Sequence, residues 1–259
     1  MYPILTRYGP FLLYTYQVVM GLGLVAALGW LAWSARHQPA WWRALDGVLW
    51  VAGAALVGGR LGFVWLNWAY FASHRAEIAW PQLGGLAYHG AMSAGLLTLW
   101  GWSRRQKRSP ARYADWLAPA MALMFVFGWS ACYLDGCAFG RNALLGWFSA
   151  DLPDVYGVFA VRYQTQLAGV FFALLTAAWV LPAARRAWPP GVLFGLTLAA
   201  LSLPRAVIGL FRGDVMPLWR GLPLDTLLDA GLMVVGLLVA LDGARRHLWR
   251  DKPAHNSST

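Results

Sequence analysis

A histidine among glycines opens one of the long apolar segments of this chain, in the stretch Gly84-Gly85-Leu86-Ala87-Tyr88-His89-Gly90. An ionisable side chain at membrane depth is energetically expensive, and such side chains usually mark functional sites. Imidazole exchanges a proton near neutral pH, so His89 is predicted to act as a general base or a proton shuttle. The structural alternative is a buried histidine that hydrogen-bonds to an aspartate or a carbonyl.

Arg60 is a second ionisable residue inside an apolar segment, where Gly59 precedes it and Gly62 follows. A guanidinium group matches the oxygens of a phosphate and can bind them through two hydrogen bonds. A membrane offers phosphate as a phospholipid headgroup, so Arg60 is predicted to bind phospholipid. The alternative is an arginine that snorkels toward the membrane surface.

The segment from Phe127 to Arg141 combines the end of an apolar run with glycines. Gly136 and Gly140 permit a positive φ or a close approach of two backbones, so an unwound or bent helix end is expected. Arg141 would then meet a phosphate just outside the apolar run. Cys132 and Cys137 have neither an activating neighbour nor the spacing of a metal or thioredoxin motif, so both are expected to be small core residues without a disulfide framework.

Other polar residues come in pairs along the second half of the chain. Two of these pairs have a spacing of four, which predicts that both members share one helix face. The paired aspartates are expected to form ion pairs with arginines on the same side of the membrane. Tyr16, in the first apolar segment, is expected to donate a hydrogen bond inward. The pairs are Arg162 with Gln166, Asp225 with Asp229, and Arg205 with Arg212.

Composition places these residues in a membrane protein. The 259 residues are 59% hydrophobic and only 12% charged, with a mean hydropathy of +0.49. No ordinary soluble domain is so poor in charge. Its net charge of +10 does not indicate nucleic-acid binding, because the basic residues lie in short connections between apolar segments, where they set topology and can contact anionic lipid.

Seven apolar segments are long enough to cross a bilayer as helices, which takes about 20 residues each. The fold class is therefore predicted to be an all-α polytopic membrane protein, with residues 1–250 as one integral-membrane domain and residues 251–259 as a disordered polar tail. The predicted spans are 11–34, 47–69, 84–103, 114–134, 165–184, 189–210 and 225–242.

The connections between these segments predict the orientation. One alternate set carries 13 Lys and Arg residues and the other set carries seven. Since basic connections stay in the cytoplasm, the N-terminus is predicted to lie outside and the C-terminus inside. The outer connections 135–164 and 205–224 are long and contain Gly, Pro, Arg and Asp, so chemistry is expected on the outer side.

The order of these motifs resembles that of the prolipoprotein diacylglyceryl transferase family, and the resemblance covers residues 9 to 212. Several motifs match in the order of the family, and together they are more specific than any one of them. The matches are Gly9-Pro10 with Tyr16, Gly59-Arg60-Leu61-Gly62, Gly84-Gly85 with His89-Gly90, Gly128 with Gly136 and Gly140, Arg162 with Gln166-Leu167, and Arg205 with Arg212.

The resemblance implies transfer of the sn-1,2-diacylglyceryl group from phosphatidylglycerol to the lipobox cysteine of prolipoproteins, in the bacterial cytoplasmic (inner) membrane. The implied partners are phosphatidylglycerol, prolipoprotein signal peptides and membrane lipids, and no cofactor or metal is implied. His89, Tyr16 and Arg205 would be the catalytic residues. The implied phospholipid-binding residues are Arg60, Arg141, Gly140, Arg162 and Arg212.

The chain also departs from the family pattern at polar positions. Trp129 and Cys132 stand where the family has Arg and Asn, Cys137 replaces an acidic residue and Gly209 replaces a Glu, while Ala168-Gly169 stands in place of Tyr-Glu. Three alternatives follow. Arg141, Arg162 or Arg220 takes over the role of the missing arginine, the enzyme uses another phospholipid or acceptor, or the protein binds lipid without catalysis.

Overall fold

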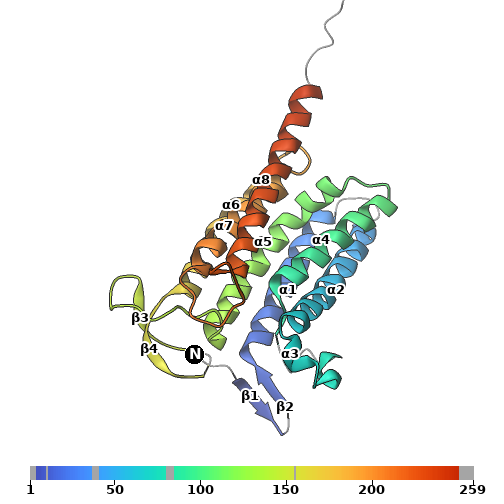
Figure 1. The fold of residues 1–259 in the computed structure, drawn as a ribbon. Helices are drawn as coiled ribbons and strands as arrows, with labels where there is room; N and C mark the ends of the chain where they lie inside the picture. Colours follow the sequence, from blue (N-terminus) through green and yellow to red (C-terminus); the bar gives the residue numbers. More distant parts are fainter. Residues whose placement is uncertain (1–3, 10, 37–40, 80–84, 155, 251–259) are drawn as a thin grey trace, which may run out of the picture.

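The computed structural model describes residues 4–9, 11–36, 41–79, 85–154 and 156–250. Gly84 and the predicted tail 251–259 lie outside these ranges. Long helices pack side by side into an elongated bundle, from one end of which the last helix projects (Figure 1). The hairpins β1–β2 and β3–β4 lie at the opposite end. The helices are α1 (Thr15–Ala35), α2 (Trp41–Leu66), α3 (Trp68–Phe71), α4 (Tyr88–Arg105), α5 (Pro110–Asp135), α6 (Thr165–Ala183), α7 (Val192–Gly209) and α8 (Leu224–Arg250), with a 3-10 helix η1 (Arg75–Ala79) before α4.

Six of the described helices are long and apolar enough to span a membrane, namely α1, α2, α5, α6, α7 and α8. This chain is therefore an all-α polytopic membrane protein. The predicted span 84–103 forms α4, but this helix is not one of the six, because His89, Ser93, Thr98 and two terminal arginines lower its hydropathy. The helix α7 continues through Pro204.

Short antiparallel hairpins join the helices. They are β1 (Ile4–Tyr8) with β2 (Phe11–Tyr14), β3 (Ser149–Pro153) with β4 (Phe159–Tyr163), and β5 (Leu218–Trp219) with β6 (Leu222–Pro223). The prediction that the first span begins at residue 11 is wrong, since Phe11–Tyr14 pairs with β1 and the helix begins at Thr15.

A second correction concerns Arg162 and Gln166, which were expected on one helix face. Arg162 lies on β4 and Gln166 on α6, so the spacing of four does not correspond to one helical turn.

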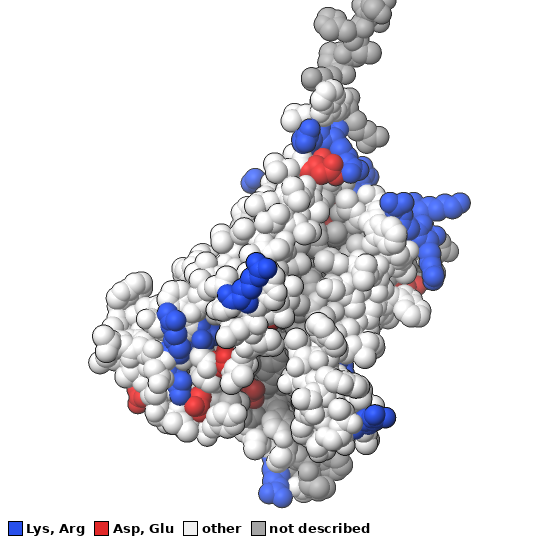
Figure 2. Space-filling model, viewed as in Figure 1, with Lys and Arg blue, Asp and Glu red and all other residues white. Residues whose placement is uncertain are grey.

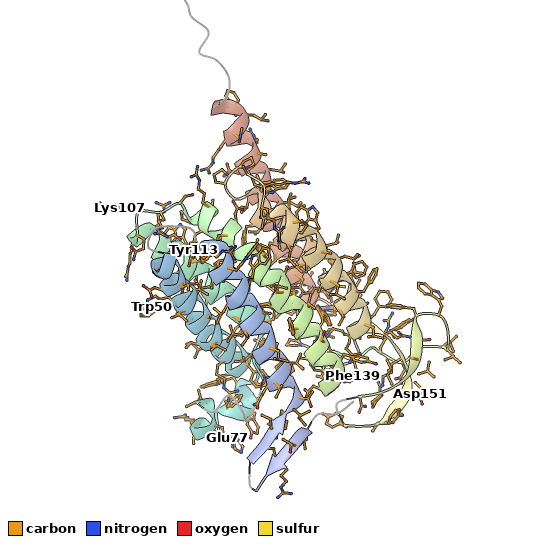
Figure 3. All side chains as sticks on the ribbon, turned by 180° about the vertical axis from the view of Figure 1, so that it is seen from behind. Trp50, Glu77, Lys107, Tyr113, Phe139 and Asp151 are labelled. Atoms are coloured by element: carbon orange, nitrogen blue, oxygen red, sulfur yellow. A yellow bond between two sulfur atoms is a disulfide. The ribbon has the colours of Figure 1, made fainter. Side chains whose placement is uncertain are left out.

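The core lies where α5 meets α6 and α7. Ala118, Ala122, Val180 and Leu198 have no exposed surface. Small side chains let membrane helices approach closely enough for van der Waals packing to hold them together. Figure 3 shows the two ends of the resulting bundle, with Lys107 and Tyr113 toward one end and Glu77 and Asp151 toward the other.

Candidate active site

His89, in the first turn of α4, contacts a buried carboxylate on α8. Its Nε2 atom lies 3.0 Å from Oδ1 of Asp229, and the Nε of Arg205 on α7 lies 3.1 Å from the same oxygen. Asp229 is only 2% exposed. A carboxylate buried so deeply needs hydrogen-bonding and charged partners, because it is removed from water. Asp229 therefore joins the histidine of α4 to the arginine of α7.

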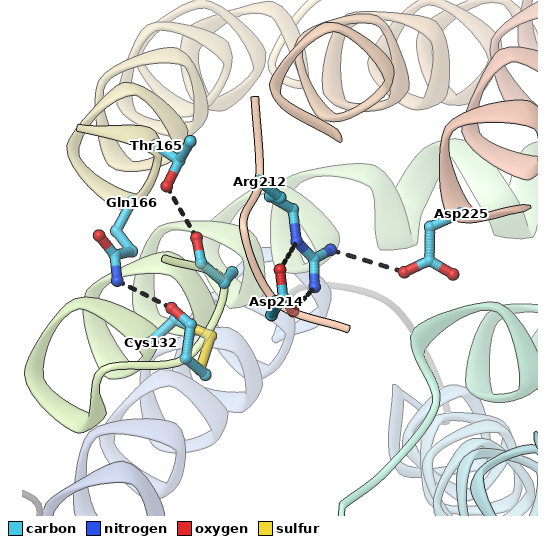
Figure 4. The surroundings of a disulfide bond; sticks show 8 residues. Cys132, Thr165, Gln166, Arg212, Asp214 and Asp225 are labelled. Atoms are coloured by element: carbon cyan, nitrogen blue, oxygen red, sulfur yellow. Dashed lines mark hydrogen bonds and ion pairs between the residues drawn. A yellow bond between two sulfur atoms is a disulfide. The ribbon is translucent and has the colours of Figure 1, made fainter. Parts of the chain in front are cut away.

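A second carboxylate lies on the other side of the imidazole ring. Asp225 is one turn before Asp229 on α8, and its Oδ1 is 3.6 Å from Nδ1 of His89. This distance exceeds that of a hydrogen bond. The other oxygen of Asp225 is 3.5 Å from a terminal nitrogen of Arg212, which also forms an ion pair with Asp214 (Figure 4). The network thus runs from Arg205 through Asp229 to His89, and from His89 through Asp225 to Arg212.

The charge of Arg212 is held by this arrangement. Burial lowers its pKa, but the hydrogen bond to Asp214 and the charges of Asp214, Asp225 and Asp229 outweigh burial and raise that pKa above its ordinary value. Arg212 therefore supplies a fixed positive charge beside Asp225.

Two aromatic rings flank the guanidinium of Arg205. Its Cζ atom lies 3.9 Å from the ring centre of Tyr88 and 6.0 Å from that of Trp129. Such contacts stabilise a cation in a site poor in water. Of the three guanidinium nitrogens of Arg205, only Nε donates to an acceptor among the described residues. Both terminal nitrogens are therefore available to a phosphate.

Trp129 itself fits because of a neighbouring glycine. A Cβ atom on Gly169 of α6 would lie 2.1 Å from Cδ2 of the indole, so no larger residue has room there. Gly209 is similarly confined, because a Cβ atom added at this position would lie 2.3 Å from the Oγ1 of Thr226. Two departures from the family pattern, at positions 129 and 209, are therefore accommodated by the neighbours that face them.

Cys132 and Cys137 form a disulfide (Figure 4), so the expectation that both are small core residues is wrong. The bond joins the last turn of α5 to the segment that follows Gly136, whose φ of 91° ends the helix. Thr165 and Gln166 at the start of α6 donate to the carbonyls of Ala138 and Cys137. The predicted unwound segment is thus real from Gly136 onward, and it is tied down covalently and by hydrogen bonds.

Gly140 and Arg141 belong to this same segment. A Cβ at Gly140 would lie 2.1 Å from the carbonyl oxygen of Tyr163, and Gly140 pairs with Arg212 as an isolated bridge. The exposed guanidinium of Arg141 lies over the rings of Phe211 and Tyr163, and none of its nitrogens donates to an acceptor among the described residues. Arg141 is thus a cation carried on the strand-like segment beside Arg212.

Arg162 is committed elsewhere. It is 8% exposed, it forms an ion pair with Asp154 at 3.0 Å, and it lies over the ring of Phe139. No hydrogen bond or ion pair among the described residues joins it to His89. Its ion pair with Asp154 stabilises the β3–β4 hairpin.

Arg60 holds the segment before α4. Its Nε and two terminal nitrogens donate to the carbonyls of Ile78, Glu77 and Gly85, and it is 8% exposed. The glycines beside it let α2 approach α4, because a Cβ on Gly90 would lie 2.4 Å from the carbonyl oxygen of Gly58. Arg60 and its glycines thus fix where α4 begins, one residue before His89.

Tyr16 is half-buried on α1, which packs against α5. No described contact connects Tyr16 with His89.

The structure adds Asp229 and Tyr88 to the predicted residues. The expected pairing of Asp225 and Asp229 with arginines is confirmed. His89 hydrogen-bonds to an aspartate, a contact that is compatible with a structural role and with a catalytic one. In the sequence, the spacing of Asp225 and Asp229 at the start of a span pointed to a polar cluster. That spacing did not reveal that His89 lies between the two carboxylates. Among the described residues, no His, Cys, Asp and Glu side chains are grouped so as to hold a metal ion.

Comparison with known proteins identifies relatives along most of the chain. Residues 3–241 match the family model described as prolipoprotein diacylglyceryl transferase. A protein of Rhodospirillum rubrum named phosphatidylglycerol–prolipoprotein diacylglyceryl transferase is 28% identical over 262 residues, which cover 92% of this chain and 90% of the relative. Proteins of the same name from Ruegeria pomeroyi, 28% identical over 84% of this chain and 79% of the relative, and Azospirillum brasilense, 27% identical over 94% and 95%, are also similar.

Proposed function

Since the chain belongs to the prolipoprotein diacylglyceryl transferase family, we propose that it transfers the diacylglyceryl group of phosphatidylglycerol to the thiol of a prolipoprotein cysteine. The observation that carries this proposal is the cluster in which Asp229 holds His89 and Arg205 together. It combines a proton acceptor with a guanidinium that has two terminal nitrogens unused. Thiol alkylation with a phosphate leaving group needs both.

His89 serves as the general base in this reaction. The thiolate is the reactive nucleophile, so the proton of the incoming thiol must be removed. Asp229 occupies the Nε2 side of the imidazole, whereas Asp225 leaves the Nδ1 side more open. The thiol proton therefore passes to Nδ1, and the hydrogen bond to Asp229 keeps the ring oriented.

Arg205 serves the leaving group. The new carbon–sulfur bond forms as the bond between the glyceryl carbon and the phosphate oxygen breaks, and the bonding electrons leave with glycerol phosphate. Charge that develops on the phosphate is stabilised by fixed cations in a site of low dielectric constant. The terminal nitrogens of Arg205 face this charge, and Arg141 and Arg212 add to the positive potential on the same side of the bundle.

Arg60, Gly140 and Arg162 have supporting roles in this proposal. Arg60 positions the start of α4 through three carbonyls, while Gly140 permits the backbone contact with Tyr163. Arg162 stabilises the adjacent hairpin through Asp154. Tyr16, half-buried in the first turn of α1, would donate a hydrogen bond to the lipid or to the signal peptide.

The proposed topology has seven spans with α4 as the third, the N-terminus outside and the C-terminus in the cytoplasm of a bacterium. Two observations support it. Lys and Arg gather around the end from which α8 projects (Figure 2), as expected for a cytoplasmic end. The disulfide joins the last turns of α5 to the segment that follows, and disulfides persist in oxidising compartments such as the periplasm. This end of α5 lies at the hairpin end of the bundle, away from the projecting end of α8 (Figure 1).

The test is a transfer assay with the purified protein, phosphatidylglycerol and a lipobox peptide, read by the mass of the peptide and by released glycerol phosphate. We expect His89→Ala and Arg205→Ala to abolish transfer while both variants still accumulate in the membrane. Arg104→Gln, at the other end of α4, is the matched control and should retain activity. Normal transfer by either site variant would refute the assignment.

Phosphatidylglycerol also needs to be compared with other lipids, because Trp129 places an aromatic ring where the resemblance leads one to expect a cation. The same assay with phosphatidylethanolamine and with phosphatidic acid identifies the donor. Transfer from one of these lipids but not from phosphatidylglycerol would assign the chain a divergent donor.

A further inference from the structure

A large cavity lies at the end of the bundle opposite His89. Its volume is about 640 Å³, within the range of roughly 300–1,000 Å³ that small-molecule sites occupy. It opens between the last turns of α1, the start of α5 and the connection from α6 to α7. None of the residues predicted for catalysis or phospholipid binding lines it.

Four arginines from three parts of the chain surround this cavity, which we call the arginine–tryptophan cavity. They are Arg36, Arg112, Arg185 and Arg186, and all four are exposed at its mouth. Asp115 is the one acid among the described lining residues, and both of its oxygens accept hydrogen bonds from the backbone of Gly191 and Phe194 at the start of α7. The mouth therefore has a strong excess of positive charge.

Two of these cations approach the same indole ring. Cζ of Arg36 lies 4.9 Å from the ring centre of Trp33, and Cζ of Arg185, from the connection between α6 and α7, lies 5.4 Å from it. Both guanidinium charges attract an anion to this part of the mouth, and Arg185 can donate a charge-assisted hydrogen bond to it.

The walls below the mouth are aromatic and apolar. Trp30, Trp116 and Trp188 are half-buried there, and Leu193 is buried. The indole nitrogen of Trp116 already donates a hydrogen bond to Ser34. Tryptophan prefers the interface between lipid headgroups and acyl chains. A ligand that fits must therefore carry an anionic head at the mouth and an apolar body between the indoles.

We propose that the arginine–tryptophan cavity binds an anionic phospholipid of the adjoining leaflet, with the phosphate between the arginines and the glycerol backbone and upper acyl chains against the tryptophans. A free phosphate would meet the arginines but would leave the indole walls without a contact. This lipid site is separate from the His89 cluster and does not depend on the proposed transferase activity.

The test uses full-length protein in nanodiscs that contain phosphatidylglycerol with a diazirine in its upper acyl chain. Cross-linked peptides are mapped by mass spectrometry. We expect adducts on the segments 30–36, 112–119 and 184–193, and a decrease of about tenfold in Arg185→Gln/Arg186→Gln, as the loss of a charge-assisted hydrogen bond predicts. Arg104→Gln/Arg105→Gln removes the same charge from the same end of the bundle and should leave these adducts unchanged.

Several outcomes would overturn the proposal. They are equal labelling of the three segments in the Arg185→Gln/Arg186→Gln variant, equal labelling by diazirine phosphatidylcholine, and loss of labelling with millimolar inorganic phosphate, which would indicate a soluble anion as ligand. If the double variant does not accumulate, Arg112→Gln gives the same readout with a smaller expected decrease. Labelling of these segments is independent of transfer, so an inactive enzyme would still reveal the lipid site.

Discussion

Asp229 is the residue on which the proposed chemistry depends, because one of its oxygens contacts both His89 and Arg205. A carboxylate at 2% exposure needs partners that compensate its charge. His89 and Arg205 are these partners, and Asp229 in turn fixes the orientation of the imidazole. Asp229 is thus a positioning residue that acts through His89 and Arg205.

Replacement of this carboxylate tests that role. Asp229→Asn keeps the size of the side chain, but its amide can donate to Nε2 and so hold the wrong imidazole tautomer. We expect the rate of transfer to fall by about 10²- to 10⁴-fold, the range that general base catalysis contributes, with normal accumulation in the membrane. Asp242→Asn changes an exposed partner of Arg246 on the same helix, and the rate of transfer by this control variant should equal that of the parent protein. A rate within twofold of the parent protein would contradict a positioning role for Asp229.

Trp129 offers a second residue-scale test, because the resemblance would suggest that arginine belongs there. The indole is 8% exposed and lies against Gly169 beside the guanidinium of Arg205. Trp129→Arg would remove a buried aromatic side chain, which typically lowers the free energy of unfolding by about 3–5 kcal/mol. It would also place a second cation near Arg205 without adding a carboxylate to pair with it.

We therefore expect Trp129→Arg to lower both the melting temperature and the transfer rate instead of improving catalysis. Thermal unfolding in detergent and the transfer assay measure the two effects. Trp147→Arg changes a tryptophan that is 95% exposed in the connection after α5, and it should change neither. Faster transfer by Trp129→Arg would show that the missing arginine limits this enzyme.

At the scale of elements, the sequence predicts the helices that are apolar throughout, and the structure confirms α1, α2, α5, α6, α7 and α8 as candidate spans. It does not predict the hairpins, because strands of two to five residues that pair through backbone hydrogen bonds leave little trace in side-chain patterns. Arg162 illustrates the consequence, since its spacing to Gln166 imitates a helical turn across a strand-to-helix boundary. The disulfide was not predicted for a related reason. The spacing of Cys132 and Cys137 alone does not show that α5 ends at Gly136.

The crossing of α2 and α4 is the element contact that places His89. Gly90 faces the carbonyl of Gly58, and the amide of Ala87 donates to the carbonyl of Gly59 at 2.9 Å. A methyl group on Gly90 would push the helices apart and shift the adjacent histidine. We expect Gly90→Ala to destabilise the protein by about 1–3 kcal/mol, the usual effect of overpacking, and to reduce transfer.

Gly101→Ala is the matched control, because a Cβ at that position of α4 meets nothing within 4 Å. An alanine that fits within a helix usually adds about 0.4–1 kcal/mol of stability. Thermal unfolding should therefore separate the two variants in opposite directions. Equal melting temperatures for Gly90→Ala and Gly101→Ala would mean that the glycine crossing does not determine the position of α4.

For the whole molecule, the departures from the family pattern are linked to one another in space. Cys132 and Cys137 bond to each other, and Trp129 lies over Gly169. These four changes are accommodated in pairs, so this end of the bundle keeps a defined shape although polar side chains are missing. The sequence marks these positions only one at a time, because the contacts that link them exist only in the folded chain.

The disulfide also gives the most direct test of orientation. If the outer end faces an oxidising compartment, a membrane-impermeant maleimide added to intact cells should label Cys132 and Cys137 only after reduction. In a Cys132→Ser/Cys137→Ser background, Arg104→Cys at the opposite end should be labelled only after the membrane is permeabilised. The physical reason is that the two ends are separated by the apolar length of the bundle, so one reagent cannot reach both from the same side. Labelling of Arg104→Cys in intact cells would reverse the proposed topology and place the His89 cluster at the cytoplasmic face, where the glutathione pool would keep both cysteines reduced.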